Sequence, residues 1–96
     1  MYLKVYRIDN EVLVAVCDEK YLGRELLEGD LQLKVSKEFY GDSTATREEI
    51  ADALKDATVA NLVGEESVAV AVDLGLVDTG HIIFIQNIPH AQMVRV

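Results

Sequence analysis

Alternation of apolar and polar positions opens the chain. The runs YLKVYRI and VLVAVCD are rich in β-branched and aromatic residues, and the residues DNE lie between them. Because Asp and Asn tolerate the backbone conformations of tight turns, this pattern predicts a β-hairpin. Apolar residues fill every position from 12 to 17, so both faces of the second strand are apolar. We expect this strand to be central in a sheet.

Turn residues and one alternating run follow. Asp18 is a candidate cap for a short helical turn that Gly23 ends, and Gly29 with Asp30 marks a second turn. In LQLKVSKEF, apolar and polar residues alternate from residue 31 to residue 36. This run predicts a third strand with one face exposed to water.

The clearest helical pattern lies in TREEIADALKDATVANLVG. Thr46 with Glu49 has the signature of a capping box, and Gly64 is a natural stop, so we predict one long helix between them. Its apolar stripe places the amide of Asn61 on the buried side. Since a buried amide needs hydrogen-bond partners, we predict that Asn61 bonds the backbone of residues 86–91.

The segment ESVAVAVDLG is mostly apolar, so periodicity does not distinguish helix from strand. Acidic residues at its start and Gly75 followed by Leu76 at its end favour a helix over residues 66–74. HIIFIQ predicts a buried strand, Pro89 a turn, and MVRV a short last strand.

The predicted order of elements is β-β-β-α-α-β-β. Short turns join consecutive strands, and the helices are grouped in the middle of the chain. This arrangement is typical of the α+β class: a mostly antiparallel sheet with two helices packed on one face. A length of 96 residues fits a single globular domain over residues 1–96.

The charge is acidic but unevenly distributed. The chain has 17 acidic and 9 basic residues, for a formal net charge of −8. A uniformly acidic surface would repel phosphate, which disfavours broad electrostatic binding of nucleic acid. Seven of the basic residues and five of the six aromatic residues, however, lie in residues 1–48. A cationic, aromatic surface is therefore expected in that half.

The chain shows no feature of a membrane or secreted protein. No apolar run approaches the ~18 residues of a membrane span, and the alternating, charged start MYLKVYRID is unlike a signal peptide. Cys17 is the single cysteine, so an internal disulfide is excluded. We expect a soluble, cytoplasmic protein.

Standard catalytic and metal-binding motifs are absent from the sequence. Cys17, His81 and His90, with Asp18, could in principle bind zinc, but they lack the local spacing that such sites show. The charge of Asp18 would raise the pKa of the Cys17 thiol, which disfavours a nucleophile. We therefore predict no catalytic residue, no metal ligand and no cofactor.

Two groups of residues remain as functional candidates. The first has side chains that local structure does not explain: Cys17, Asp18, Asn61, His90 and Gln92. The second could form a cationic surface with aromatic platforms for single-stranded RNA: Lys20, Tyr21, Arg24, Lys34, Lys37, Phe39 and Tyr40. The alternative for the second group is that its aromatic residues anchor turns to the core and its cations are ordinary surface residues.

The segments CDEKYLG, GDLQLKVSKEFYG, ANLVG and PHAQ occur in this order. With them the chain resembles an uncharacterised archaeal family, the domain of unknown function 424. The matching positions are Cys17, Asp18, Glu19, Leu22, Gly23, Phe39, Tyr40, Gly41, Asn61, Leu62, Gly64, Pro89, His90, Ala91 and Gln92. The resemblance implies a small cytosolic domain without an established activity, and it supplies no catalytic assignment.

Three functions fit these observations. The leading one is a non-enzymatic binding module whose partner is RNA or a ribonucleoprotein. The second is a small enzyme or small-molecule binder that uses His90 with Asp18 in a cleft. The third is a homodimer in which an edge strand, such as MVRV, pairs with its mate.

Overall fold

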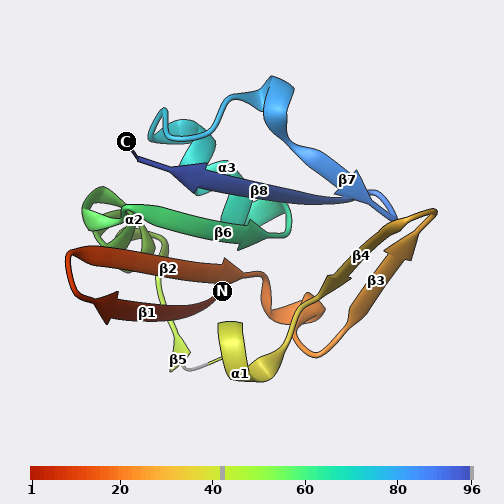
Figure 1. Cartoon of the computed structure of the whole chain (residues 1–96), viewed down its shortest axis with the longest axis horizontal. Coiled ribbons are helices and arrows are strands. Elements are labelled where there is room, and N and C mark those ends of the chain that lie inside the picture. Colours follow the sequence, from red (N-terminus) through yellow and green to blue (C-terminus); the bar gives the residue numbers. More distant parts are fainter. Residues whose placement is uncertain (42, 96) are drawn as a thin grey trace.

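The computed structural model describes residues 1–41 and 43–95. It contains a six-stranded sheet in the order β5-β1-β2-β6-β8-β7 and a separate two-stranded sheet, β3-β4 (Figure 1). The strands are β1 (Tyr2–Ile8), β2 (Glu11–Cys17), β3 (Glu25–Glu28), β4 (Leu31–Lys34), β5 (Ser43–Thr44), β6 (Val59–Val63), β7 (Ile83–Ile85) and β8 (Ile88–Val94). The helices are α1 (Lys37–Tyr40), α2 (Arg47–Asp56) and α3 (Glu65–Asp73), with 3-10 turns η1 (Glu19–Tyr21) and η2 (Thr79–His81).

The predicted α+β class is confirmed. Each strand pair is antiparallel except β2 with β6, so the large sheet is mixed but mostly antiparallel. The two longer helices, α2 and α3, pack on one face of it. Within the described residues, no helix is both long enough and apolar enough to cross a membrane.

The main core lies between the sheet and these two helices. Alternate residues of the three central strands point toward α2 and α3, as the two-residue period of a strand requires. The buried members of this core are Val14, Val16, Ile50, Leu54, Ala57, Ala60, Leu62, Val68, Val70, Ala71, Val77, Ala91 and Met93. Small and β-branched side chains dominate, which fits the low aromatic content of the chain.

A second core lies on the opposite face of the sheet. There η1, the β3-β4 hairpin and α1 cover the end of the sheet near Cys17. Its buried residues are Ala15, Cys17, Tyr21, Leu26, Val35, Tyr40, Val63, Ile85 and Ile88. In Figure 1 the hairpin extends from this cover toward the β7-β8 turn, where the Gln86 N–H donates to Glu28 Oε1 at 2.7 Å.

The prediction for residues 18–36 is wrong in two respects. The segment before Gly29 forms strand β3 rather than a turn alone, and β4 ends at Lys34. The pair β3-β4 also stands outside the main sheet. Gly29 at φ +58° makes the reversal possible, but the sequence ELLE has no alternation that would have shown a strand.

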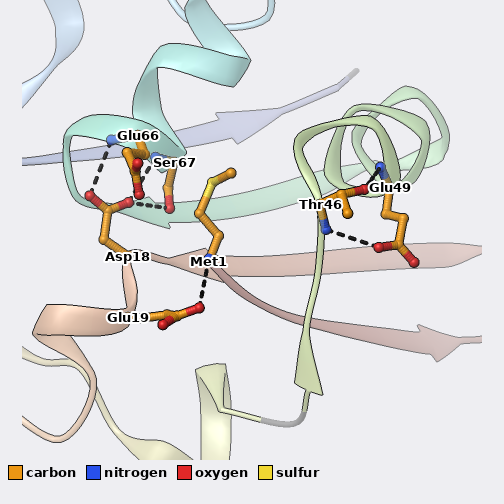
Figure 2. Close-up of polar contacts among 7 residues, drawn as sticks. All are labelled: Met1, Asp18, Glu19, Thr46, Glu49, Glu66 and Ser67. Carbon is orange, nitrogen blue, oxygen red and sulfur yellow. Dashed lines mark hydrogen bonds and ion pairs between the residues drawn. The ribbon is translucent and has the colours of Figure 1, made fainter.

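The prediction of one long helix up to Gly64 is also wrong, because the helix ends at Asp56. The capping box at Thr46 is confirmed: its hydroxyl accepts from the Glu49 N–H, and the Glu49 carboxylate accepts from the Thr46 N–H (Figure 2). The helix then stops at Asp56, and strand β6 follows. Thr58 bonds to Val12, and all five residues of β6 pair in parallel with β2, which lies far earlier in the sequence. Tertiary pairing here overrides a local helical pattern.

The C-terminal elements are only partly as predicted. The helix over residues 66–74 is confirmed as α3. The turn before the last strand is formed by Gln86 and Asn87, both at positive φ, while Pro89 lies within β8. β8 lies between β6 and β7, but β7 pairs only with Ile88, Pro89 and His90, so among the described residues Met93 and Val94 have a neighbouring strand on one side only. Val96 lies outside the described residues.

Candidate functional site

Asp18 is a buried carboxylate at the end of β2. Its side chain is 2 % exposed and points at the start of α3 (Figure 2). Its oxygens accept from the Glu66 N–H at 3.1 Å, the Ser67 N–H at 2.9 Å and the Ser67 hydroxyl at 2.7 Å. These bonds satisfy two of the free N–H groups of the helix and place a negative charge at its positive end. Asp18 therefore caps α3 rather than the short turn beside it.

Gly64 is the residue that allows this close approach. It adopts φ +109°, and a Cβ added to it would lie 2.3 Å from Cγ of Asp18. Its N–H donates to the Pro89 carbonyl at 2.9 Å, so the start of α3 is also tied to β8. The sequence predicted Gly64 as the end of a helix. In the structure Gly64 instead precedes helix α3. Glycine is needed there because the Asp18 carboxylate occupies the space that a side chain at position 64 would fill.

We predict that Gly64→Ala destabilises the protein by about 3 kcal/mol or more, because it combines a strained backbone with a clash against a buried carboxylate. Chemical denaturation measures the free energy of unfolding. Gly75→Ala is the matched control: Gly75 also has a positive φ, +73°, but an added Cβ meets nothing within 4 Å. Equal losses in the two variants would show that the backbone alone requires glycine at position 64.

Cys17 faces away from Asp18, into the core beneath η1 and α1. Burial raises the pKa of the Cys17 thiol to about 11, and the neighbouring Asp18 charge adds to this shift. A thiol of this kind is neutral at physiological pH and is a poor nucleophile. Cys17 is best explained as a core residue.

His90 lies half-buried on β8, on the same face of the sheet as Cys17. Its Nδ1 lies 3.0 Å from the Leu62 carbonyl oxygen. Because a carbonyl only accepts, Nδ1 carries the proton and Nε2 is the free nitrogen of the neutral ring. The proposed pairing with Asp18 is wrong, since the Asp18 carboxylate serves α3 on the opposite face. Among the described residues, no group of three or more His, Cys, Asp or Glu side chains could hold a metal ion.

We predict that His90 makes stability pH-dependent. Burial lowers the pKa of His90 in the folded state. Below about pH 6.5 the unfolded state then binds more protons than the folded state, so the His90 contribution is present above that pH and is lost as pH falls. Denaturation of His90→Gln should give a flatter profile of unfolding free energy between about pH 7 and 5.5.

The exposed His81, in η2, provides the control for this experiment. His81→Gln should retain the slope of the parent protein. If His90→Gln retained it as well, acid sensitivity would arise elsewhere in the molecule.

Asn61, which is partly buried, and Gln92, which is exposed, form an amide pair in the middle of the sheet. They face each other across β6 and β8, and Gln92 Nε2 donates to Asn61 Oδ1 at 2.9 Å. The predicted bond from Asn61 to the backbone of residues 86–91 is wrong, because Asn61 lies on a strand rather than on a helix. Asn61, His90 and Gln92 lie on the same face of the sheet. Cys17 lies on this face too, but α1 and the hairpin cover it. Asp18 lies on the opposite face, against α3.

This face is open beyond the cover of α1 and the hairpin. The amide pair lies among the apolar side chains of Leu13, Val59 and Val94, the last 69 % exposed. Only one cation and one carboxylate, those of Lys4 and Glu11, come to this face from β1, β2, β6 and β8. We call the exposed part, residues 13, 59, 61, 90, 92 and 94, the open sheet surface.

The aromatic residues of the predicted RNA surface are mostly unavailable. Tyr21 and Tyr40 are buried, and the Tyr21 hydroxyl donates to the Glu65 carboxylate. They anchor the cover to the sheet instead of serving as stacking platforms. Phe39 is partly buried and stacks on Tyr6 with ring centroids 5.5 Å apart. Tyr6 was missed by the sequence interpretation, although the alternation of β1 places it on the same face as Lys4.

The cations of that surface divide into two places. Arg24, Lys34 and Lys37 line a hollow of about 340 Å³ at the base of the hairpin, together with Glu25 and Glu38. The residues that line this hollow come from the two ends of the β3-β4 hairpin and from α1. Lys20 instead pairs with the Glu65 carboxylate at 3.5 Å.

A second hollow, of about 530 Å³, lies near the end of β2. It is lined by Met1, Asp18, Glu19, Lys20 and Glu66. The N-terminal amine contacts Glu19 at 3.4 Å there (Figure 2). Because both oxygens of Asp18 already accept hydrogen bonds from α3, this acidic hollow is explained by helix capping.

Comparison with known proteins supports the resemblance noted in the sequence. The model of a family described as "Protein of unknown function (DUF424)" matches residues 6–96. The chain is similar to a crystal structure of an uncharacterised conserved protein from Methanopyrus kandleri, with 27 % sequence identity and a TM-score of 0.78 over 99 % of this chain and 93 % of that one. No curated protein matches the chain.

Proposed function

The chain belongs to the DUF424 family of proteins of unknown function, and from its geometry we propose that it is a non-enzymatic binding module for single-stranded RNA. The contact region would comprise the open sheet surface and the cationic hollow at the base of the hairpin. The enzyme alternative loses its support, because the Cys17 thiol has a raised pKa and His90 is not paired with Asp18.

The amide pair of Asn61, partly exposed, and Gln92, exposed, is the observation that carries this proposal. Their mutual hydrogen bond fixes both side chains and leaves the Asn61 NH₂ and the Gln92 carbonyl oxygen available. Donors and an acceptor held side by side on an apolar surface complement the edge of an unpaired base. The free Nε2 of His90 adds another polar group to the same surface.

Aromatic and cationic groups lie on the same side of the sheet as this pair. The stacked rings of Tyr6 and Phe39 lie on the side of the sheet that carries α1. The hollow has three cationic side chains against two carboxylates, so it is locally positive in an acidic protein. A phosphate in the hollow and a base on the open sheet surface would use both features of a single strand.

We predict that a fluorescently labelled single-stranded RNA binds at low salt and that Asn61→Ala/Gln92→Ala weakens binding by about tenfold, through lost base contacts. Lys37→Glu should weaken it too and should reduce the salt dependence by about one phosphate contact. Fluorescence anisotropy titrations over a range of salt concentrations measure both effects.

Lys55→Glu is the matched control, because it makes the same change in net charge on α2, on the opposite side of the sheet. It should weaken binding less than Lys37→Glu does. Equal effects of the two reversals would indicate unspecific attraction, and absence of binding at low salt would refute RNA as the ligand.

A further inference from the structure

We propose that two copies of this chain associate through the free edge of β1, which joins their sheets into one. Among the described residues, the strand that pairs with the outer side of β1 is the two-residue β5, at Tyr2 and Leu3. The rest of the strand, from Lys4 to Ile8, has no neighbouring strand on that side among the described residues. This association is independent of the RNA proposal.

The hairpin fixes which main-chain groups face the free edge. A two-residue turn joins Ile8 to its partner Glu11, so this pair exchanges hydrogen bonds and alternate pairs along β1-β2 do the same. Val5 and Arg7 belong to the other set and direct their N–H and C=O groups outward. Val12, which lies opposite Arg7, supports this assignment. Its N–H and C=O groups bond to Thr58, on the side of β2 away from β1, so they do not bond to Arg7.

The outward groups of Val5 and Arg7 take part in none of the hydrogen bonds among the described residues. A two-fold axis at Tyr6 would place Val5 of one copy opposite Arg7 of the other, and the reverse. Each of these pairs exchanges two hydrogen bonds, so all four outward groups on each chain are satisfied. No other antiparallel register of β1 with itself does this without displacing β5.

The side chains suit this register. Tyr6 would lie opposite Tyr6 of the second copy, and Lys4 opposite Ile8, so no like charges face each other. Val5 and Ile8, 38 % and 66 % exposed, would gain apolar neighbours. Lys4 and Arg7 of the two copies would lie close together at this interface, so their charges, like the net charge of −8 on each chain, oppose association at low salt.

Strand β7, at the opposite edge of the sheet, is less suited to a second copy than β1. On β7 the outward residues are Ile82, Phe84 and Gln86, because Phe84 lies opposite Pro89, which has no N–H. The Ile82 N–H donates to Thr79, and the Gln86 N–H donates to Glu28 Oε1. Only Phe84 is left with both groups free, so β7 offers half of what β1 offers.

The interface would be small, since it consists mainly of a single pair of short strands. Stable interfaces usually bury about 1,200–2,000 Å² in total. We therefore expect a reversible dimer whose population rises with protein concentration. It should also strengthen as salt screens the repulsion between two acidic chains.

Sedimentation velocity from micromolar to millimolar protein tests the proposal. The parent chain should shift from monomer to dimer over this range. Val5→Pro removes an outward N–H but no hydrogen bond of the β1-β2 ladder, so the chain should fold and dimerise at least about tenfold more weakly. Phe84→Pro is the matched control on β7, with the same geometry, and should dimerise like the parent chain.

Val5→Lys provides a second variant that keeps the N–H. It places a cation opposite Arg7 of the second copy and should also weaken the dimer, most strongly at low salt. If Val5→Pro fails to fold, Val5→Lys decides the question. A parent chain that stays monomeric at millimolar concentration, or a dimer that only Phe84→Pro disrupts, would overturn the proposal.

Discussion

The buried carboxylate of Asp18 is the interaction on which the arrangement of this protein depends. A charge removed from water destabilises a fold unless hydrogen bonds compensate it. Here the first turn of α3 supplies the donors. Because the same stretch of chain also bonds backbone to backbone, Asp18 to Val63 and Gly64 to Pro89, the ends of β2, β6 and β8 meet at one point.

This junction sets which side chains reach which face. Side chains of a strand alternate, so a shift of one residue in β6 or β8 would exchange its two faces. With the observed register, small apolar residues of these strands meet α2 and α3, while Asn61, His90 and Gln92 face the other way. The register of β6 and β8 therefore determines which residues form the open sheet surface.

The elements that were predicted correctly from the sequence are those that depend on interactions between neighbouring residues. The first hairpin, the capping box at Thr46 and the helix over residues 66–74 were predicted from neighbouring residues, and the α+β class followed from their order. Strand β6 was missed because its partner β2 lies about 46 residues earlier in the chain, and pairing over that distance leaves no periodic signal. Pro89 was interpreted as a turn, although its place opposite Phe84 requires no N–H from it.

For the candidate functional residues, too, the residue types could be selected from the sequence, but their positions depend on long-range contacts. Asp18 and Gly64 were both noted, but for the wrong elements, since only the fold brings them within contact distance. Asn61, His90 and Gln92 were identified by residue type, and their common face was not predictable while β6 was taken as helix. Tyr21 and Tyr40 are the opposite case. Their aromatic character suggested a surface, whereas the deep cover over Cys17 uses them as core.

The free energy of unfolding of Asp18→Asn tests the central claim most directly. Asparagine keeps the volume of the side chain but removes the charge and turns one acceptor into a donor that faces the N–H groups of α3. The account predicts a loss of about 2–4 kcal/mol in chemical denaturation. A loss within about 0.5 kcal/mol would contradict it, because α3 and the strand ends would then be held without this carboxylate.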